Sequence, residues 1–315
     1  MRYQLEAPAK VNLFLGVQCE CDGSRHLLQS VFQAISLHDT LEVEVEPDAF
    51  LPGISIENRF EPGITAVNVP LEDNLVYRAA NQLAVLIDHP LTERFDIRLH
   101  KRIPVQAGLG GGSSDCAAML VLLAQLWGLD LQDDAIQKTA SSLGSDINFF
   151  FEGGCALFDR YGDRFVEQVP ARPLSMVLAK PEYGISTGAV YRAFDQSPAV
   201  AGSSDALICA LSDADANCAA PAYIARVAAA LSNNLTDAAL RIEPELAETF
   251  ATMKTVMPAS EPLLSGSGAA VFALCDNERA AEDGAAELRR RGLWAVAARS
   301  SEGGVRNMTA SPSKA

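Results

Sequence analysis

Residues Gln106–Asp115 read QAGLGGGSSD, and this stretch carries the most specific chemical signal in the sequence. Four of its ten positions are glycine, and two serines and an aspartate follow at the start of an apolar run, CAAMLVLLAQLW (Cys116–Trp127). Glycine loses more backbone freedom on folding than any other residue, so a dense group of glycines needs a physical reason. The pattern indicates a backbone that adopts left-handed angles or lets a ligand approach closely.

The apolar run has helical length and is apolar nearly all round, so we expect a buried helix with the glycines and serines at its N-terminus. A helix N-terminus presents unpaired N–H groups and about half a positive charge, which attract phosphate. We therefore expect a phosphate-binding loop, in which Gly110→Val would weaken nucleotide binding by bringing a Cβ atom against the phosphates. A flexible glycine-rich surface loop is the alternative that this stretch alone leaves open.

Two familiar nucleotide-binding motifs do not fit the stretch. It contains no Gly-Lys-Ser/Thr, so it is not a phosphate loop of the Walker type. A dinucleotide-binding fingerprint requires glycines directly between a strand and a helix. Here Pro104 and the residues after it separate the strand-like segment that ends at Ile103 from the first glycine.

Composition narrows the class of protein. The chain has 315 residues, of which 49% are hydrophobic and 21% charged, as expected for a globular protein with two domains. Its formal net charge of −15 argues against a DNA or RNA partner, which requires a basic face. No apolar run reaches the ~18 residues of a membrane span, and no signal-peptide pattern is visible. We therefore expect a cytoplasmic protein with no membrane partner, whose seven scattered cysteines are reduced.

Apolar periodicity and turn residues divide the chain into short strands and helices. Strands are expected at Val11–Val17, Leu41–Glu46, Phe95–His100, Cys155–Phe158, Phe165–Val169, Ser175–Ala179, Ala269–Leu274 and Trp294–Ala298. Helices are expected after Asp73-Asn74 and after Asp133-Asp134, along Cys116–Trp127, and at Pro244–Val256 and Glu278–Arg290. Because strands and helices do not alternate regularly, the expected fold class is α+β.

The domain boundary is expected near residues 165–180, which gives an N-terminal domain at 1–170 and a C-terminal domain at 171–305. Residues 195–221, rich in Ala, Ser and Asp, are expected to form a loop or insertion between helices. Residues 306–315 are expected to be a disordered tail.

Two further segments flank the glycine loop: PAKVNLFL (Pro8–Leu15) precedes it and LLSGSGAAVFAL (Leu263–Leu274) follows it. This order resembles the GHMP kinases, the family named for galacto-, homoserine, mevalonate and phosphomevalonate kinases. The other segments similar to the family are NLVYRAA (Asn74–Ala80), KRIPVQAGLGGGSSD (Lys101–Asp115), LGSDINFFFEGG (Leu143–Gly154), GISTGAVY (Gly184–Tyr191) and NNL (Asn233–Leu235). Each short segment is only moderately specific, but seven in sequence are strongly so.

The resemblance implies a fold and a reaction. The fold would be a two-domain GHMP kinase fold, in which the first domain is similar to the second domain of ribosomal protein S5 and the second is ferredoxin-like. The site would lie in the cleft between them. The segments are most similar to the branch of the family that acts on methylerythritol linked to cytidine diphosphate, in the non-mevalonate isoprenoid pathway. The implied reaction moves the γ-phosphoryl group of ATP to the 2-hydroxyl of that substrate, with Mg²⁺ but without an assigned protein ligand for the metal.

Carried over position by position, the resemblance implies that Lys10 and Asp146 form the catalytic pair. Asp146 would accept or orient the hydroxyl proton and Lys10 would screen developing charge; a helix cap after Gly144 is the structural alternative for Asp146. The implied ATP contacts are Asn74, Lys101, Pro104, Gly108, Leu109, Gly110, Gly111, Gly112, Ser113 and Ser114. The implied substrate contacts are Asn12, Arg25, His26, Ser265, Gly266, Ser267 and Gly268.

One stretch departs from the family. Family members have Asp-Gly-Tyr/Phe-His, whose aromatic residue and histidine hold the cytosine ring, whereas this chain has DGSRH (Asp22–His26). The guanidinium plane of Arg25 is suited to stacking on cytosine; altered or weaker cytosine recognition is the alternative, with His26 an ordinary surface histidine. A smaller departure is Asn148, where proline is common. The departures leave open a GHMP kinase for a different alcohol, and a non-catalytic nucleotide-binding relative.

Overall fold

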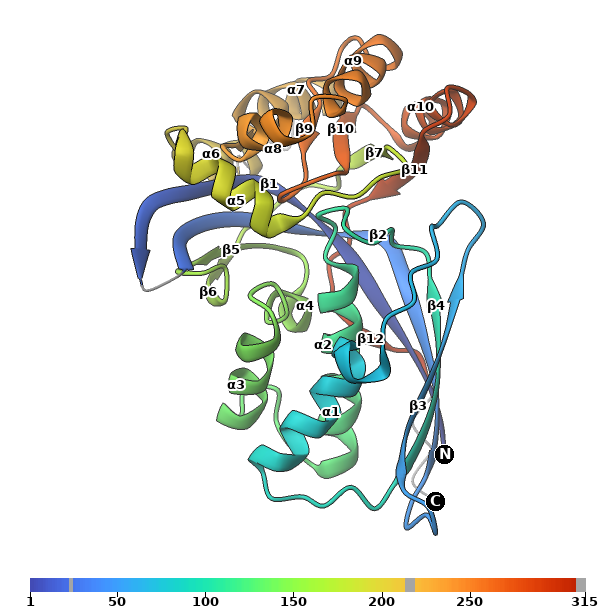
Figure 1. Cartoon of the computed structure of the whole chain (residues 1–315). Coiled ribbons are helices and arrows are strands. Elements are labelled where there is room, and N and C mark those ends of the chain that lie inside the picture. The colour runs from blue at the N-terminus through green and yellow to red at the C-terminus, as the bar shows by residue number, and fades with distance from the viewer. Residues whose placement is uncertain (23–24, 213–218, 310–315) are drawn as a thin grey trace.

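The computed structural model describes residues 1–22, 25–212 and 219–309 (Figure 1). Its strands are β1 (Arg2–Asp22), β2 (Arg25–Glu46), β3 (Gly53–Phe60), β4 (Arg94–Lys101), β5 (Cys155–Asp159), β6 (Arg164–Gln168), β7 (Ser175–Lys180), β8 (Ser232–Asn233), β9 (Leu263–Leu264), β10 (Val271–Cys275), β11 (Trp294–Arg299) and β12 (Arg306–Asn307). Its helices are the 3-10 helix η1 (Leu71–Asp73) and α1 (Leu75–Leu86), α2 (Gly111–Trp127), α3 (Asp134–Leu143), α4 (Phe149–Glu152), α5 (Thr187–Gln196), α6 (Ser204–Ser212), α7 (Ala220–Ala230), α8 (Thr236–Ile242), α9 (Leu246–Val256) and α10 (Glu278–Arg290). The strands form two sheets.

The first sheet is built on the long antiparallel pair β1 and β2. Its order is β12-β1-β2-β4-β3, with β4 antiparallel to β2 and β3 parallel to β4 at the edge. Strands β5 and β6 extend it from another part of β2, and β8 pairs with β1. Register shifts in β1 occur between Pro8 and Ala9 and between Asn12 and Phe14, so the strand is irregular on both sides of Lys10.

Helices α1 to α4 cover one face of this sheet (Figure 1). The alternation in FDIRLH turns Phe95, Ile97 and Leu99 inward, and these side chains pack with the apolar helix α2. The buried residues of α2 include every position from Ser114 to Leu120, so the expectation of a buried helix is confirmed. Burial of each large apolar side chain contributes about 1.5–3 kcal/mol, and this core therefore fixes the N-terminus of α2 relative to the sheet.

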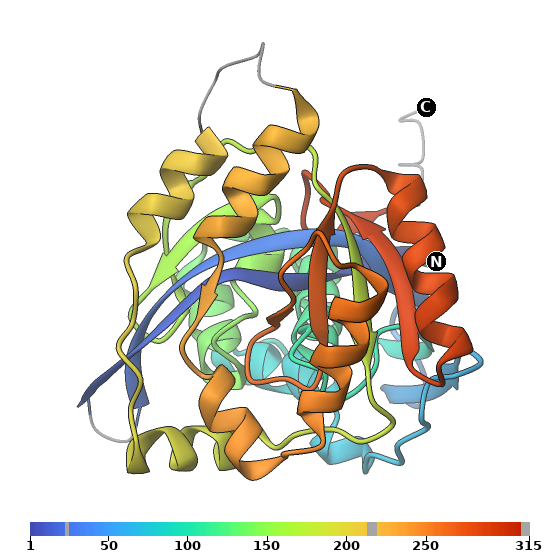
Figure 2. The same cartoon turned by 90° about the horizontal axis from the view of Figure 1, so that it is seen from above.

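The second sheet is antiparallel and has the order β11-β7-β10-β9. Helices α5, α8, α9 and α10 pack against one face of it. Its other face shares a core with the first sheet, to which β1 contributes Val11, β7 contributes Leu178 and β10 contributes Phe272. Helices α6 and α7 close the side of this shared core, and Figure 2 shows them beside the long strands β1 and β2.

The chain passes from the first sheet to the second between Gln168, where β6 ends, and Ser175, where β7 begins. This change lies close to the predicted boundary at 170/171. However, β8 and β12 come from the C-terminal part and pair with β1, so the division at a single residue stays a prediction.

Two predictions about irregular segments were wrong in part. Residues 306–309 belong to the first sheet, because β12 pairs with Leu5 and Glu6, and the Met308 N–H donates to Gln4; residues 310–315 lie outside the described residues. The segment 195–221 contains helix α6 and the start of α7. The high content of Ala, Ser and Asp in this segment suggested a loop, but α6 has an apolar face that is buried. Residues 213–218 are not described.

The other predicted strands and helices are confirmed with shifted ends, although β1 and β2 are much longer than expected. The elements β3, β8, β9, α4, α5 and α8 were not predicted. The side chain of Asn74 caps α1 by accepting a hydrogen bond from the Val76 N–H at 2.9 Å. In the described parts of the chain, none of the helices combines the length and apolar character that crossing a membrane requires.

Candidate active site

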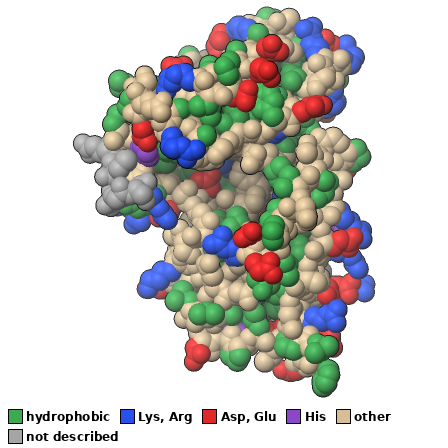
Figure 3. Space-filling model, in the orientation of Figure 1, with side chains coloured by type: hydrophobic (Ala, Val, Ile, Leu, Met, Phe, Trp, Pro, Cys, Tyr) green, Lys and Arg blue, Asp and Glu red, His purple; other side chains and the backbone are tan. Residues whose placement is uncertain are grey.

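A cleft of about 850 Å³ opens where the two sheets and their helices face each other. Figure 3 shows the surface hollowed at this place, with Lys or Arg side chains at the rim. The glycine loop forms one wall of the cleft, and residues of β1, the start of β2, the segment before α4 and helix α5 form the others. Segments that lie far apart in the sequence therefore meet in a single pocket.

The glycine loop has its unusual composition because it packs closely against protein. Gly108 and Gly110 have positive φ angles of 72° and 74°. A Cβ atom on Gly108 would lie 2.0 Å from the carbonyl oxygen of Ser265, and one on Gly110 would lie 2.6 Å from the ring of Phe150. The expected reason for the effect of Gly110→Val was therefore wrong, because the added atoms would strike Phe150 and Lys10 in the protein.

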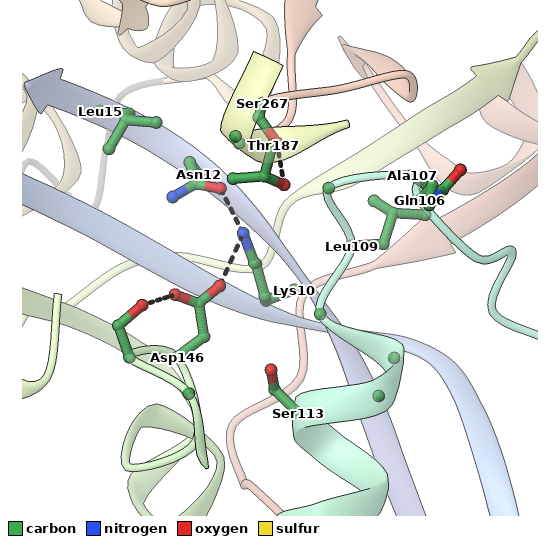
Figure 4. Close-up of a pocket in the computed structure, with 18 of the residues that line it drawn as sticks. Lys10, Asn12, Leu15, Gln106, Ala107, Leu109, Ser113, Asp146, Thr187 and Ser267 are labelled. Carbon is green, nitrogen blue, oxygen red and sulfur yellow. Dashed lines mark hydrogen bonds and ion pairs between the residues drawn. The ribbon is translucent and has the colours of Figure 1, made fainter. Parts of the chain in front are cut away.

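The N-terminus of α2 faces the cleft. Gly111, Gly112 and Ser113 line it, whereas Ser114 is fully buried and does not. The Ser113 side chain points toward Asp146 (Figure 4). Unpaired N–H groups in the first turn of this helix, together with its dipole, make this end of the cleft suited to phosphate.

A substitution at Gly112 tests whether the phosphates of a bound nucleotide lie against the first turn of α2. A Cβ atom there would meet only Leu75, at an ordinary distance of 3.6 Å, so Gly112→Ala should fold normally. We expect the added methyl group at the helix N-terminus to raise the Kd for ATP about tenfold, which corresponds to about 1.4 kcal/mol. Calorimetric ATP titration measures this.

Gly202→Ala is the matched control, because its Cβ atom would also make only ordinary contacts and Gly202 does not line the cleft. An unchanged ATP affinity in Gly112→Ala would show that the phosphates do not approach this turn.

Lys10 and Asp146 form an ion pair in the cleft, with 3.2 Å between Lys10 Nζ and Asp146 Oδ2 (Figure 4). The Lys10 side chain is only 4% exposed, and its ammonium also donates to Asn12 Oδ1 at 2.6 Å. The hydroxyl of Ser145 donates to the other carboxylate oxygen of Asp146 at 3.2 Å. Asp146 does not cap a helix, because the N-cap of α4 is Asn148.

The C-terminal glycine-serine turn supplies the opposite wall. Gly266 and Ser267 line the cleft, and Ser267 shares a hydrogen bond of 2.8 Å with Thr187 at the start of α5. Ser265 is fully buried and donates to the Gly108 carbonyl, and Gly268 does not line the cleft. The predicted substrate contacts in this turn therefore fall into two that face the cleft and two that support it.

Comparisons with known proteins agree with this architecture. The family model described as the GHMP kinases N terminal domain matches residues 74–154, and the GHMP kinases C terminal model matches residues 222–292. The chain is 38% identical to 4-diphosphocytidyl-2-C-methyl-D-erythritol kinase of Pelotomaculum thermopropionicum, over 90% of this chain and 93% of the relative. It is 37% identical to the kinase of the same name from Nocardia farcinica, over 92% of this chain and 90% of that one. The chain belongs to the GHMP kinases.

Solved structures of GHMP kinases have the same architecture. A crystal structure of 4-(cytidine 5'-diphospho)-2C-methyl-D-erythritol kinase superposes with a TM-score of 0.71 at 31% identity and covers 95% of this chain and all of that one. Homoserine kinase from Cytophaga hutchinsonii superposes with a TM-score of 0.68 at 16% identity, over 98% of this chain and 97% of that one, a likeness of fold alone. The predicted α+β GHMP kinase fold is confirmed.

Two ATP contacts implied by the GHMP kinase resemblance have other partners in this structure. Asn74 is the N-cap of α1 and does not line the cleft, whereas its neighbour Leu75 does. Lys101 lines the cleft, but its ammonium is buried and forms ion pairs with Asp39 and with Asp115, the latter at 2.5 Å. Contacts of Asn74 and Lys101 with adenosine stay predictions.

The buried cluster of Lys101, Asp39 and Asp115 ties β4, β2 and α2 together beneath the phosphate end of the cleft. Asp39 Oδ1 also accepts the backbone N–H groups of Arg102 and Ile103. Burial raises the pKa of the Asp115 carboxyl to about 7; the ammonium of Lys101 opposes this rise, and the charge of Asp39 adds to it. Burial lowers the pKa of Lys101, but the two carboxylates outweigh this effect and the net direction is upward. Burial and the charge of Asp39 thus favour a proton on Asp115 in spite of the neighbouring Lys101 ammonium.

This arrangement predicts a pH dependence of stability. Between pH 3.8, where the unfolded carboxyl titrates, and about 7, the folded protein holds a proton that the unfolded chain releases. The contribution of Asp115 to the free energy of unfolding is therefore full below this window and falls as the pH rises through it. Asp115→Asn should show a shallower fall across the window in urea unfolding. Asp134→Asn, at an exposed carboxylate, is the control, and an unchanged slope in Asp115→Asn would contradict the prediction.

The far end of the cleft is lined by Arg25 and His26, the two predicted cytosine contacts. Arg25 lies over the ring of Tyr161, 5.6 Å from its centroid, and both line the cleft. His26 Nε2 lies 2.6 Å from Asp195 Oδ1, and its ring lies 5.2 Å from that of Tyr191. Sequence reasoning missed Tyr161, Tyr191 and Asp195. Tyr191 ends the quoted segment GISTGAVY, but no pattern in the sequence pointed to Tyr161 or Asp195.

Proposed function

We propose that this chain is an ATP-dependent kinase that phosphorylates the 2-hydroxyl of 4-diphosphocytidyl-2-C-methyl-D-erythritol, in the non-mevalonate route to isoprenoid precursors. The observation that carries the proposal is the Lys10–Asp146 ion pair, which faces the N-terminus of α2 across the cleft. Relatives named 4-diphosphocytidyl-2-C-methyl-D-erythritol kinase match about nine-tenths of the chain, and this supports the proposal that this chain acts on the same substrate.

The chemistry follows from this geometry. The triphosphate of ATP would lie along the first turn of α2, where backbone N–H groups and the Ser113 hydroxyl can donate to it. Among the described residues, the Lys10 ammonium donates to Asn12 and forms an ion pair with Asp146, so a third proton remains for the transferring phosphoryl group. The alcohol would lie beside Asp146, within reach of its carboxylate.

In the transfer step, the alcohol oxygen attacks the γ-phosphorus while its proton passes to an Asp146 oxygen. The bond between the γ-phosphorus and the bridging oxygen breaks, and its electron pair leaves with ADP. Such a reaction depends on alignment and charge neutralisation, which Lys10 and the helix N-terminus supply.

Mg²⁺ would enter as part of the nucleotide substrate. Within the described residues, no three His, Cys, Asp or Glu side chains group together to hold a metal. In kinases Mg²⁺ keeps several waters and is bound by one or two carboxylates together with substrate phosphates.

Removing the proton acceptor tests the proposed step. We expect Asp146→Asn to lower kcat by about 10²- to 10⁴-fold, the usual contribution of a positioned general base, with ATP affinity nearly unchanged. Steady-state ADP release and calorimetric ATP titration measure the two quantities. The matched control is Asp134→Asn, an exposed aspartate on α3; near-normal turnover by Asp146→Asn would refute the role of Asp146.

Substrate dependence tests the assignment itself. Purified protein with MgATP should release ADP rapidly only when 4-diphosphocytidyl-2-C-methyl-D-erythritol is added. ATP binding without such turnover would contradict the proposed substrate.

A kinase for a different alcohol is the second candidate, and the pairing of His26 with Asp195 favours it, because this histidine already has a protein partner. Binding of cytidine diphosphate in preference to uridine diphosphate would argue for the first candidate. A non-catalytic relative is disfavoured, since Lys10, Asp146 and the glycine loop are all retained.

A further inference from the structure

Asn12 lies between the catalytic lysine and a buried serine of the neighbouring strand. Its Oδ1 atom accepts from Lys10 Nζ at 2.6 Å, and its Nδ2 atom donates to Ser30 Oγ at 2.8 Å. Ser30 in turn donates to the backbone carbonyl of Phe14 at 2.8 Å. The result is a continuous chain of polar contacts: an ion pair joins Asp146 to Lys10, and hydrogen bonds lead from Lys10 through Asn12 and Ser30 to the main chain of β1.

The donors and acceptors of this chain determine which way the Asn12 amide points. The Lys10 ammonium has only donors, so the atom of Asn12 that faces it must be the oxygen. The single hydroxyl proton of Ser30 is committed to a carbonyl, which can only accept, so the Ser30 oxygen must receive a proton from the amide nitrogen. Both ends of the amide thus require the same orientation.

The local backbone explains why a hydroxyl is needed at Ser30. The register shift between Asn12 and Phe14 places two residues of β1 opposite one of β2, as in a β-bulge, and bulges re-aim side chains next to active sites. The Ser30 hydroxyl reaches the Phe14 carbonyl beside this bulge. Ser30 itself is fully buried and does not line the cleft, so it cannot touch the substrate.

We propose that Ser30 is a positioning residue for phosphoryl transfer: by fixing the Asn12 amide, it holds the Lys10 ammonium in line with Asp146. The inference rests on the proposed kinase function. Without the hydroxyl, the Asn12 amide keeps only its bond to the Lys10 ammonium and loses its link to β1, so the amide and the ammonium are both held less firmly in line with Asp146.

Ser30→Ala and Ser30→Thr, compared with the wild type, provide the first test. We expect Ser30→Ala to lower kcat about tenfold, the equivalent of about one hydrogen bond, with KM for ATP unchanged within about twofold. Ser30→Thr keeps the hydroxyl on a residue suited to a strand and should restore most of kcat.

The matched control is Ser204→Ala. Ser204 is also buried and bonds to the Gln29 side chain at 3.0 Å, but it touches neither Asn12 nor the cleft. It should lose stability in thermal unfolding and keep kcat. If Ser30→Ala also lost only stability, the positioning role would be overturned.

A double-mutant cycle tests whether Ser30 acts through Asn12. In an Asn12→Ala background, Ser30→Ala should cause little further loss of kcat, because the amide through which it acts is gone. Fully additive losses would overturn the proposal.

Exchange of the Asn12 side-chain amide protons with solvent, followed by nuclear magnetic resonance, gives a readout independent of turnover. One of the two protons should exchange slowly in the wild type and in Ser30→Thr and rapidly in Ser30→Ala; equal rates in all three would overturn the proposal. If the wild type showed this protection but no turnover with the cytidyl substrate, the substrate assignment would fail while the Ser30–Asn12 link stood.

Discussion

Main-chain hydrogen bonds on both sides of the glycine loop are the interactions on which the rest of the structure depends. On one side, the Lys10 N–H donates to the Leu109 carbonyl at 3.0 Å. On the other, the N–H groups of Ala269 and Ala270 donate to the carbonyls of Gln106 and Ala107 at 3.1 and 3.0 Å. One extended segment thereby joins β1 of the first sheet to the C-terminal glycine-serine turn of the second. The cleft exists because this segment is bonded to both.

The close approach at Gly108 follows from the same constraint. Its Cβ-free backbone lies against the Ser265 carbonyl, and the Ser265 hydroxyl bonds back to the Gly108 carbonyl at 3.0 Å. Asn233 stabilises the C-terminal glycine-serine turn, because its side-chain amide donates to the backbone carbonyls of Leu264 and Gly266. The glycine loop and the C-terminal glycine-serine turn therefore pack directly against each other and are hydrogen-bonded together.

This construction explains how a protein with a net charge of −15 can present a site suited to a polyphosphate. The positive potential is local: it comes from the N-terminus of α2 and from Lys10, whose charge is largely withdrawn from solvent. The nearby charge of Lys101 is matched by Asp39 and Asp115 below the loop, so that it mainly holds α2 against the sheet. The Lys10 ammonium, which faces the cleft, and the Lys101 ammonium, which is buried between two carboxylates, thus differ in their surroundings.

The sequence by itself determined the elements whose causes are local. The start of α1 after Asn74, the buried character of α2 and the glycine-serine pattern at its N-terminus follow from neighbouring residues along the chain. The family resemblance added the pairing of Lys10 with Asp146, which no spacing rule would provide for residues so far apart in the chain.

Tertiary structure alone decided the outcomes that depend on contacts between distant segments. In the folded chain, Ser113 lines the cleft whereas the next residue, Ser114, is buried in the core. Lys101 forms ion pairs with Asp39 and Asp115. Ser30 accepts a hydrogen bond from Asn12 beside the irregular part of β1. Tertiary structure also brought Tyr161 beside Arg25. The physical reason is that capping and helix propensity act over a few residues, whereas a hydrogen-bond partner or a stacked ring is chosen by whichever strand or helix packs alongside.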